Sequence, residues 1–457
     1  MTDTNNERNK QNDNFSNFSN CDNLNDNPTL EEANEKINIY NDKKYTLYES
    51  DSMIASFVDD PGKNATVHTP LINSPLSEDD IKTDRNNQEN SYYPKFLILI
   101  GIFYILPSLQ FVFFQSKDET IFCYYNYKCF HNLDFIPAFN AVISNILYII
   151  FGITFLIIVK LTDKYTNSDY NSLDIKKKPY LYYSLGISLI FEGICSATYH
   201  ICPTKLNFQF DTTFMFIGGI LMYITIYSKR HNEPDPMKIY SFLSFLIFVN
   251  ILPLSGLTTD FEQYFWSAIF IVLAYIMINV SIHIYYGKHF NFDIKGLRSA
   301  VRNIQKLKKK QIPKLSLLVT INVFTLGMYI WAVITQPAFT DWILGIIIVN
   351  MLIYFCYYLI QKIIYREKIS FVFWIWMIID LAIFILSLIF FAKTSSNTFL
   401  TPEESNSLNS HCIVLGYFDY HDIWHILSAT GLFIFMNIVF FLDRSIDSLV
   451  GERLQIF

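Results

Sequence analysis

The stretch that decides the fold is His421-Asp-Ile-Trp-His425-Ile-Leu-Ser-Ala-Thr-Gly-Leu-Phe-Ile-Phe-Met-Asn-Ile-Val-Phe-Phe-Leu442. Residues 423–442 contain no Asp, Glu, Lys or Arg. A helix that crosses a bilayer needs ~20 predominantly apolar residues. The stretch therefore predicts a membrane-spanning helix that opens with two histidines one turn apart on the same face.

Further apolar runs follow one another closely from Phe96 onward. Hydrophobic residues make up 51% of the 457-residue chain and charged residues 17%, against about 25% charged in soluble domains. We expect an all-α fold, a polytopic membrane helix bundle of about ten spans. The expected spans are residues 96–114, 139–159, 180–200, 207–227, 238–255, 264–286, 315–335, 342–363, 370–391 and 421–442.

The beginning of the chain has a different composition. Its first ninety residues include eighteen Asn and few large apolar side chains. Such a segment cannot bury enough surface to offset its conformational entropy. Residues 1–92 are thus expected to be a disordered Asn-rich tail without a cleavable signal peptide, and residues 93–457 the transmembrane domain.

Lysine and arginine predict the orientation of the bundle. The loops 160–179, 228–239, 287–314 and 362–369 hold twenty of them, and the alternate loops hold four. Basic loops stay on the cytosolic side, so both termini are expected in the cytosol. Four cysteines then fall in non-cytosolic loops, where oxidising conditions favour disulfides; three pairings are open to Cys123, Cys129, Cys202 and Cys412.

Residues with metal-binding side chains lie at the non-cytosolic ends of these spans. His200 ends one span, Asp211 starts the next, and His421 and His425 open the last. Three imidazoles and a carboxylate are the ligand set of a catalytic zinc. If Zn²⁺ binds there, Asp211 could act as general base towards a water molecule, and Ser196, one turn before His200, could bind that water or a developing oxyanion.

A polar seam between helices is the alternative interpretation of these side chains. Glu192, Ser196 and His200 share one helix face, and that face must point into the bundle because a carboxylate facing lipid is costly. Asp380 is a second acid within a span, either paired inside the bundle or part of a polar pathway. No glycine-rich phosphate loop and no G-x-S-x-G sequence occurs.

Short blocks of the sequence form a further pattern. They are Cys123-Tyr-Tyr-Asn126 through Cys129, Phe139-Asn140, Ser144-Asn145, Glu192-Gly193, Ser196 through Pro203, Asn207-Phe-Gln-Phe-Asp-Thr212, Tyr227-Ser-Lys-Arg-His231 and His421-Asp-Ile-Trp-His-Ile-Leu-Ser-Ala-Thr430. In their order and spacing over residues 96–457, these blocks resemble a known family, the systemic RNA-interference-defective (SID) transmembrane family. The resemblance implies passage of double-stranded RNA across membranes and association with cholesterol.

The same family is similar to the CREST-type membrane hydrolase superfamily, which includes alkaline ceramidases and adiponectin receptors. The Ser, His, Asp, His, His set of that superfamily falls here on Ser196, His200, Asp211, His421 and His425. Members of the family usually begin with a β-rich extracellular region implicated in RNA capture. In its place we expect the short Asn-rich tail, which weakens the case for direct RNA binding.

Three functions follow as hypotheses. The resemblance favours a protein that mediates or assists passage of double-stranded RNA and holds an embedded three-histidine zinc site. The residues themselves favour a zinc-dependent lipid amidase or esterase, ceramidase-like or phospholipase-like. The third hypothesis is a cholesterol- or lipid-binding protein with structural zinc. The expected partners are membrane lipids, cholesterol and double-stranded RNA, in a chain compatible with a homodimer in the plasma membrane or an endolysosomal membrane.

The orientation can be tested with epitope tags in intact cells. A tag at Asn5 is expected to resist external protease, because the basic loops place the N-terminus in the cytosol. A tag near Ser405 is expected to be cut. Cleavage at Asn5 with protection near Ser405 would mean that the bundle is inverted.

Overall fold

The computed structural model describes residues 91–134, 136–166, 179–231, 234–254, 262–286, 312–335, 337–393 and 395–443. These residues all belong to one compact unit, Leu76–Phe457. The expected disordered tail, residues 1–92, lies outside the described residues apart from its last two positions.

The described part of the chain is nearly all helical, as predicted. Apart from helices it contains two isolated β-bridges, Leu133 with Ile136 and Val414 with Phe418. In chain order the helices are α3 (Tyr92–Gln115), α4 (Phe139–Ser144), α5 (Ile146–Thr166), α6 (Pro179–Ile201), α7 (Phe208–Ser228), α8 (Pro236–Leu254), α9 (Glu262–Tyr286), α11 (Ile312–Thr335), α12 (Phe339–Ile364), α13 (Phe371–Phe391), α14 (Pro402–Ser407) and α15 (Tyr420–Phe441).

Each expected span corresponds to a long helix. Among the described residues, eight helical segments are long and apolar enough to cross a membrane, and α4 and α5 together form one of them, Phe139–Asp163. The remaining two expected spans are α8 and α9, whose apolar helical stretches are shorter, Pro236–Leu252 and Tyr264–Met277. One of these, at 238–255, includes Pro253. A multipass membrane protein follows from length and composition.

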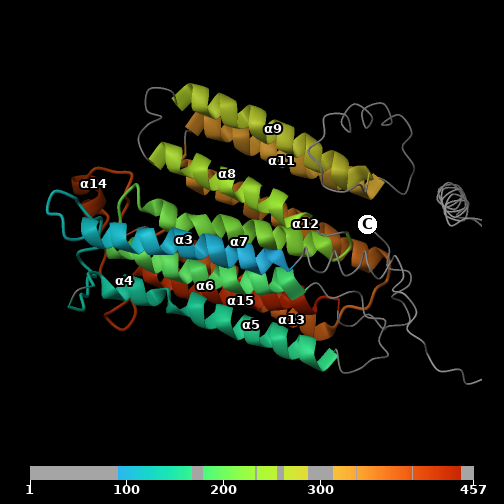
Figure 1. Ribbon diagram of the computed structural model, residues 1–457, viewed down its shortest axis with the longest axis horizontal. Helices are drawn as coiled ribbons and strands as arrows, with labels where there is room; N and C mark the ends of the chain where they lie inside the picture. Colours follow the sequence, from blue (N-terminus) through green and yellow to red (C-terminus); the bar gives the residue numbers. More distant parts are fainter. Residues whose placement is uncertain are drawn as a thin grey trace, which may run out of the picture. The chain divides into compact units, whose positions relative to one another are not determined.

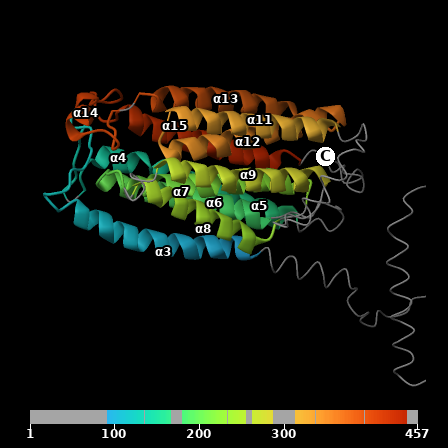
Figure 2. The same ribbon diagram turned by 90° about the horizontal axis from the view of Figure 1, so that it is seen from above.

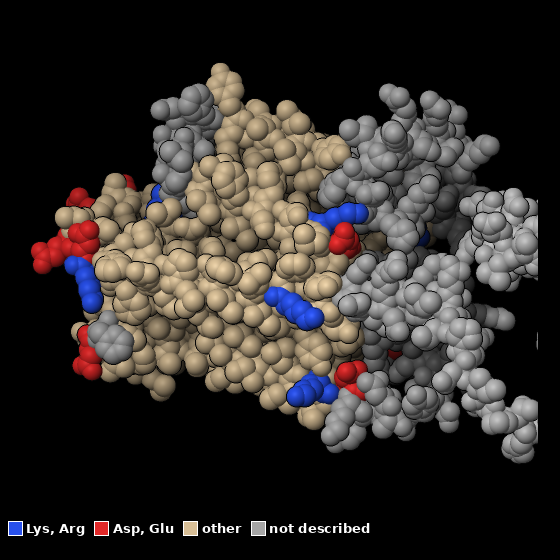
Figure 3. All heavy atoms as spheres, viewed as in Figure 1, with Lys and Arg blue, Asp and Glu red and all other residues tan. Residues whose placement is uncertain are grey.

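Helix α6 lies at the centre of the bundle. It packs against α3, α5 and α7, while α7 also contacts α8 and α12. Helix α15 packs against α5 and α13, and α11 packs against α9 and α12 (Figures 1 and 2). The outer faces are apolar: 77% of Phe371 on α13 is exposed. In the view of Figure 3, charged side chains gather near the two ends of the helices, with a broad uncharged band between them.

Glycines allow α5 and α6 to approach closely. A Cβ atom added at Gly152 would lie 2.8 Å from the carbonyl oxygen of Gly186, and one at Gly193 would lie 3.1 Å from that of Asn145. Small residues permit such contact between helices in membranes, where dispersion and packing replace the hydrophobic effect. This contact holds α6, and with it Ser196 and His200, against its neighbour.

At the far end from these residues, buried ion pairs join α7, α12 and α15. The guanidinium of Arg230 donates two hydrogen bonds to Glu367, at 3.0 and 2.6 Å. The ammonium of Lys362 lies 2.7 Å from Asp443 and 2.9 Å from Glu367. Lys229 is 3.4 Å from Asp443. We call these five residues the ion-pair network.

The network carries three positive and two negative charges. It lies where α7, α12 and α15 end, and the C-terminus of each helix carries about half a negative charge. These helix ends therefore offset the excess positive charge. Glu367 reaches the network because α12 closes in a turn in which Arg366 has φ of 56° and the Glu367 amide donates to the Lys362 carbonyl at 2.9 Å.

Gly152→Ala is expected to lower stability by about 1–3 kcal/mol, because the new methyl group overpacks the contact between α5 and α6. Gly327→Ala is the matched control, since a Cβ there meets nothing within 4 Å and alanine favours helix by up to ~1 kcal/mol. The free energies of unfolding of wild type and both variants, measured in detergent, test this expected difference in stability. Equal losses at both positions would contradict the packing argument.

The network predicts acid sensitivity. Burial raises the pKa of Asp443, but Lys229, Lys362 and Arg230 outweigh burial and hold that pKa well below its ordinary value. A carboxyl group whose pKa is depressed in the folded state stabilises the fold at pH values above its unfolded-state pKa of ~3.9. This stabilisation is lost progressively as the pH falls below that value. Asp443→Asn is therefore expected to lower the free energy of unfolding by about 3–5 kcal/mol near neutral pH.

Unfolding measured from pH 7 to pH 3 tests this expectation. The difference in free energy of unfolding between wild type and Asp443→Asn should become smaller as the pH falls below about 4. A difference that stays constant over this range would show that the charge of Asp443 does not stabilise the fold.

Candidate metal centre

Three histidine side chains lie together where α6 ends and α15 begins. The Nε2 atoms of His200 and His425 are 2.9 Å apart. One ligand nitrogen from each of His200, His421 and His425 lies within 4.8 Å of the other two. His425 is fully buried, His200 is buried and His421 half-buried. Zinc–nitrogen bonds are ~2.0–2.1 Å long, so nitrogens at these separations fit around one ion after a small adjustment.

The connection between α6 and α7 is held by several contacts. The side-chain amide of Asn207 donates to the Cys202 carbonyl at 2.8 Å and to the Gln115 side chain at 2.6 Å. Cys202 is itself in a disulfide with Cys123. These contacts fix the end of α6, which carries His200, relative to the start of α7, which carries Asp211.

The start of α15 is held by a capping box. The Asp419 side chain accepts a hydrogen bond from the Asp422 amide at 2.9 Å, and the Asp422 side chain accepts one from the Asp419 amide at 3.1 Å. Asn140 of α4 also donates to Asp422 Oδ2, at 2.9 Å. The first turn of a helix otherwise has unsatisfied amides. The cap thus orders the turn from which His421 and His425 project.

Ser196 and Asp211 form a buried pair beside the histidines. The Ser196 hydroxyl donates a hydrogen bond to Asp211 Oδ1, and both side chains are almost fully buried. Ser196 is one helical turn before His200, so both lie on one face of α6. Asp211 is outside the group of mutually close ligand atoms that the three histidines form. The pair is therefore a separate polar element rather than part of that group.

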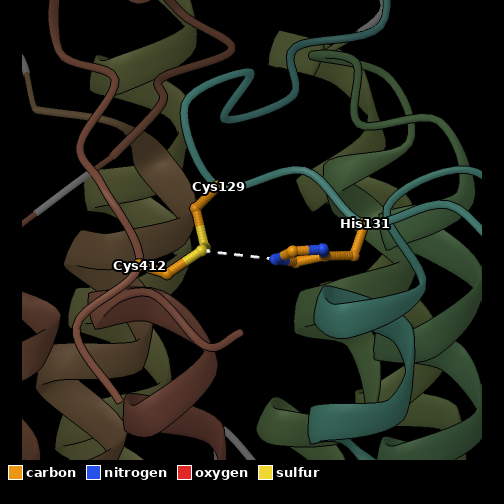
Figure 4. Close-up of side chains that lie close together, drawn as sticks. All are labelled: Cys129, His131 and Cys412. Carbon is orange, nitrogen blue, oxygen red and sulfur yellow. Dashed lines mark hydrogen bonds between the residues drawn. A yellow bond between two sulfur atoms is a disulfide. The ribbon is translucent and has the colours of Figure 1, made fainter. Parts of the chain in front are cut away.

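The four predicted cysteines form two disulfides, Cys123–Cys202 and Cys129–Cys412. The expectation that these residues pair is confirmed, and the structure selects one of the three pairings that the sequence left open. Figure 4 shows the second disulfide beside His131. Cys195, which is buried, and Cys356, which is exposed, are free, and Cys21 lies outside the described residues.

Glu192 and Asp380, which lie well inside their spans, have different surroundings. Glu192 is buried, which confirms that this face of α6 points inward, and neither carboxylate oxygen has a hydrogen-bond partner in the described part. Asp380 is half-buried on α13. A Cβ added at Gly431 of α15 would lie 3.7 Å from Asp380 Oδ1. Asp380 therefore faces α15, and it is not part of the group of close ligand atoms that the three histidines form.

Sequence reasoning missed three residues that support the site. Asn140 and Asp422 orient the start of α15, and the Tyr148 hydroxyl lies 2.5 Å from the Ser428 hydroxyl behind His425. The pattern Asp419-Tyr-His-Asp422 resembles a capping box, in which a cap and a carboxylate three residues later bond reciprocally, and could have identified Asp422. The contacts of Asn140 and Tyr148 are more than 270 residues apart in sequence and leave no local signal.

The fold and these residues define a class: a multipass helical membrane protein with a three-histidine cluster and a Ser–Asp pair at one end of its bundle. A family model described as "dsRNA-gated channel SID-1" matches residues 3–457. The chain belongs to this SID-1 family.

Curated relatives agree with this assignment. The human SID1 transmembrane family member 1 is 31% identical over 380 residues, which cover 79% of this chain and 46% of the relative. The mouse protein of the same name is 30% identical over 380 residues, with the same coverage. Cholesterol uptake protein 1 of Caenorhabditis elegans is 26% identical over 417 residues, 85% of this chain and 53% of the relative. The chain spans about half the length of the curated relatives it matches.

Proposed function

We propose that this protein assists the passage of double-stranded RNA across a plasma or endolysosomal membrane. The observation that carries this proposal is the match of the family model, described as a double-stranded-RNA-gated channel, along residues 3–457. The proposed RNA path cannot run through the histidine cluster, because His425 is fully buried and a duplex needs a wide polar surface with basic groups. We therefore propose that RNA passage uses a part of the bundle other than the histidine cluster, and that the cluster has a function of its own.

For the cluster we propose a zinc-dependent hydrolytic centre that acts on an amide or ester of a membrane lipid. The convergence of His200, His421 and His425 beside the Ser196–Asp211 pair carries this proposal. The resemblance to alkaline ceramidases supports it, since their Ser, His, Asp, His, His set matches these five positions. The site lies where α6 ends and α15 begins, and the ends of spanning helices are where we would expect lipid ester and amide groups to reach it.

The donor set suits zinc. Three neutral imidazoles are a known ligand set for a catalytic zinc with an open fourth position, and His200, His421 and His425 would hold the ion. When bound, zinc lowers the pKa of a water molecule to ~7 and polarises a carbonyl. The Asp211 carboxylate would accept a proton from that water and return it to the leaving group, as a general base does.

Ser196 has two roles in this scheme. Its hydroxyl donates to Asp211 Oδ1, which orients the carboxylate. Its oxygen can also accept a hydrogen bond, and from its position one turn before His200 it would bind a carbonyl held at the histidines. Burial of both groups excludes bulk water and strengthens each polar interaction in the site.

The name of the nematode relative, Cholesterol uptake protein 1, favours a lipid as ligand of this chain as well. A sterol-binding role with structural zinc would require a fourth protein ligand, as structural zinc sites usually have. Asp211 lies outside the close ligand group. The geometry thus favours the hydrolytic centre over a structural one.

Purified protein is expected to hold about one zinc ion per chain in this centre, since three histidines leave one position for water. The double variant His421→Ala/His425→Ala should lose that zinc. His231→Ala, whose ring stacks on Tyr227 at the other end of α7, is the matched control and should retain it. Metal analysis after chelator-free purification decides the matter; a wild-type protein free of zinc would refute the proposed centre.

Asp211→Asn separates hydrolysis from RNA passage. It keeps the side-chain size but removes the base, so turnover of a ceramide or phospholipid substrate should fall ~10²–10⁴-fold while zinc is retained. Asp118→Asn, in the loop after α3, is the control and should turn over lipid normally. Uptake of labelled double-stranded RNA should be the same for wild type and Asp211→Asn.

The results for lipid turnover and RNA uptake distinguish the two proposals. Normal lipid turnover by Asp211→Asn would eliminate the hydrolytic centre. Wild-type RNA uptake no higher than in cells without the protein would eliminate RNA passage. Loss of both activities in Asp211→Asn at normal surface expression would show that the two functions are coupled, contrary to the separation proposed above.

A further inference from the structure

The two disulfides lie in different surroundings. Cys123 and Cys202 are both buried in a hydrophobic cluster with Val112, Tyr199 and Phe210. Cys129 is also buried, but its partner Cys412 is half-buried. Cys412 is thus the more exposed end of the second disulfide, whereas the first disulfide is enclosed by apolar side chains. The Cys129–Cys412 disulfide is therefore the more accessible of the two.

An imidazole lies next to the accessible disulfide. His131 Nε2 is 3.5 Å from Cys412 Sγ (Figure 4). A disulfide sulfur carries no proton, so His131 is the donor in this contact. Its ring stacks on Tyr417 with centroids 4.6 Å apart, and its backbone amide donates to Asn140 Oδ1 at 3.1 Å. His131 is thus held with Nε2 directed at the sulfur.

We propose that Cys129, Cys412 and His131 form a second metal site that exists only when their disulfide is reduced. One ligand atom from each residue lies within 4.8 Å of the other two. Two cysteine thiolates and one histidine are a zinc ligand set with an open fourth position. The site takes Zn²⁺ or a similarly thiophilic cation and is distinct from the three-histidine cluster.

The geometry allows both states. Two sulfurs on one zinc ion lie about 3.8 Å apart, as tetrahedral bonds of ~2.3 Å require. The Cα atoms of Cys129 and Cys412 are 5.0 Å apart, so rotation of the side chains separates the sulfurs by that amount without large backbone movement. In the metal-bound state the His131 ring would carry its proton on Nδ1, so that the lone pair of Nε2 faces the ion. In the oxidised state Nε2 carries the proton and faces the sulfur.

Reduction by a small-molecule thiol is the step that opens the site. A thiolate attacks the accessible Cys412 Sγ, the S–S bond breaks, and Cys129 leaves as a thiolate. A second thiol attacks the outer sulfur of the mixed disulfide and releases Cys412. Two thiol molecules are thereby oxidised to one disulfide, and the protein gains two cysteines. Binding of Zn²⁺ then displaces two protons from these cysteines.

The site would preserve a connection between two loops. Cys129 lies in the loop after α3, and Cys412 lies in the loop that leads into α15. The neighbouring Asn126 side chain donates to Asp419 Oδ2, at 2.8 Å, and Asp419 caps α15. A bound ion would keep these loops joined after reduction, so that the start of α15 stays in place.

Metal counting on the full-length chain tests the proposal. The protein is purified in detergent, divided into oxidised and phosphine-reduced samples, desalted without oxygen and titrated with Zn²⁺. Reduction is expected to add about one zinc ion per chain. The Cys129→Ser/Cys412→Ser variant should show no such gain, and its elution profile checks that it is folded.

Histidine variants test the third ligand. His131→Ala keeps both cysteines but removes a proposed ligand. Loss of a mere outer-shell partner lowers metal affinity ~10–100-fold. After reduction, the affinity of His131→Ala for the added zinc should fall by more than this. His411→Ala, which removes the exposed neighbour of Cys412, is the matched control and should bind as wild type does. Equal weakening in both variants would refute His131 as a ligand.

Co²⁺ separates this site from the three-histidine cluster. Two thiolates give cobalt a thiolate-to-metal charge-transfer absorption, whereas a site made only of histidines does not. The absorption should appear in the reduced wild type and be absent from Cys129→Ser/Cys412→Ser, whether or not the histidine cluster binds metal. The proposal is wrong if reduced wild type gains no zinc, or if the absorption persists in the double serine variant.

Discussion

The structure depends on the close contact between α5 and α6. In hydrocarbon, helices gain little from the hydrophobic effect and are held by packing and by internal polar contacts. The glycines at 152, 186 and 193 bring the two backbones together, and the inward face of α6 then carries Glu192, Ser196 and His200. Helices α3 and α7 pack on the remaining sides of α6. The polar face of α6 is thus enclosed on all sides by protein.

The sequence predicted most of the fold because membrane spans have a strong local signal. Every expected run coincides with a helix, although the apolar stretches of α8 and α9 are shorter than those of the other spans. The histidines could be placed at one depth because helix ends fix depth. Their lateral neighbourhood could not be predicted, since which helices touch depends on contacts such as Asn140 with Asp422.

The same limit applies to the cysteines and the charges. Four cysteines on one side of the membrane predicted two disulfides, but only the arrangement of loops around α15 selects the pairing. In the ion-pair network, Lys362 and Arg230 contact Asp443 from 81 and 213 positions away in the sequence, and such distant contacts leave no local signature. In the sequence, Lys229 and Arg230 belong to a basic loop, which predicts orientation, and to the family block Tyr227–His231. Neither feature indicates their buried partners.

The ion-pair network also constrains the orientation of two helices that carry site residues. Helices α7 and α15 each carry a network contact at one end and site residues at the other, so each behaves as a lever ~30 Å long. A tilt of ~5° at the network would displace the opposite end by ~3 Å, given that length. Metal coordination tolerates only ~0.2 Å. Any process that loosened Asp443 or Arg230 would therefore be amplified along the helices into a displacement of His425 and Asp211.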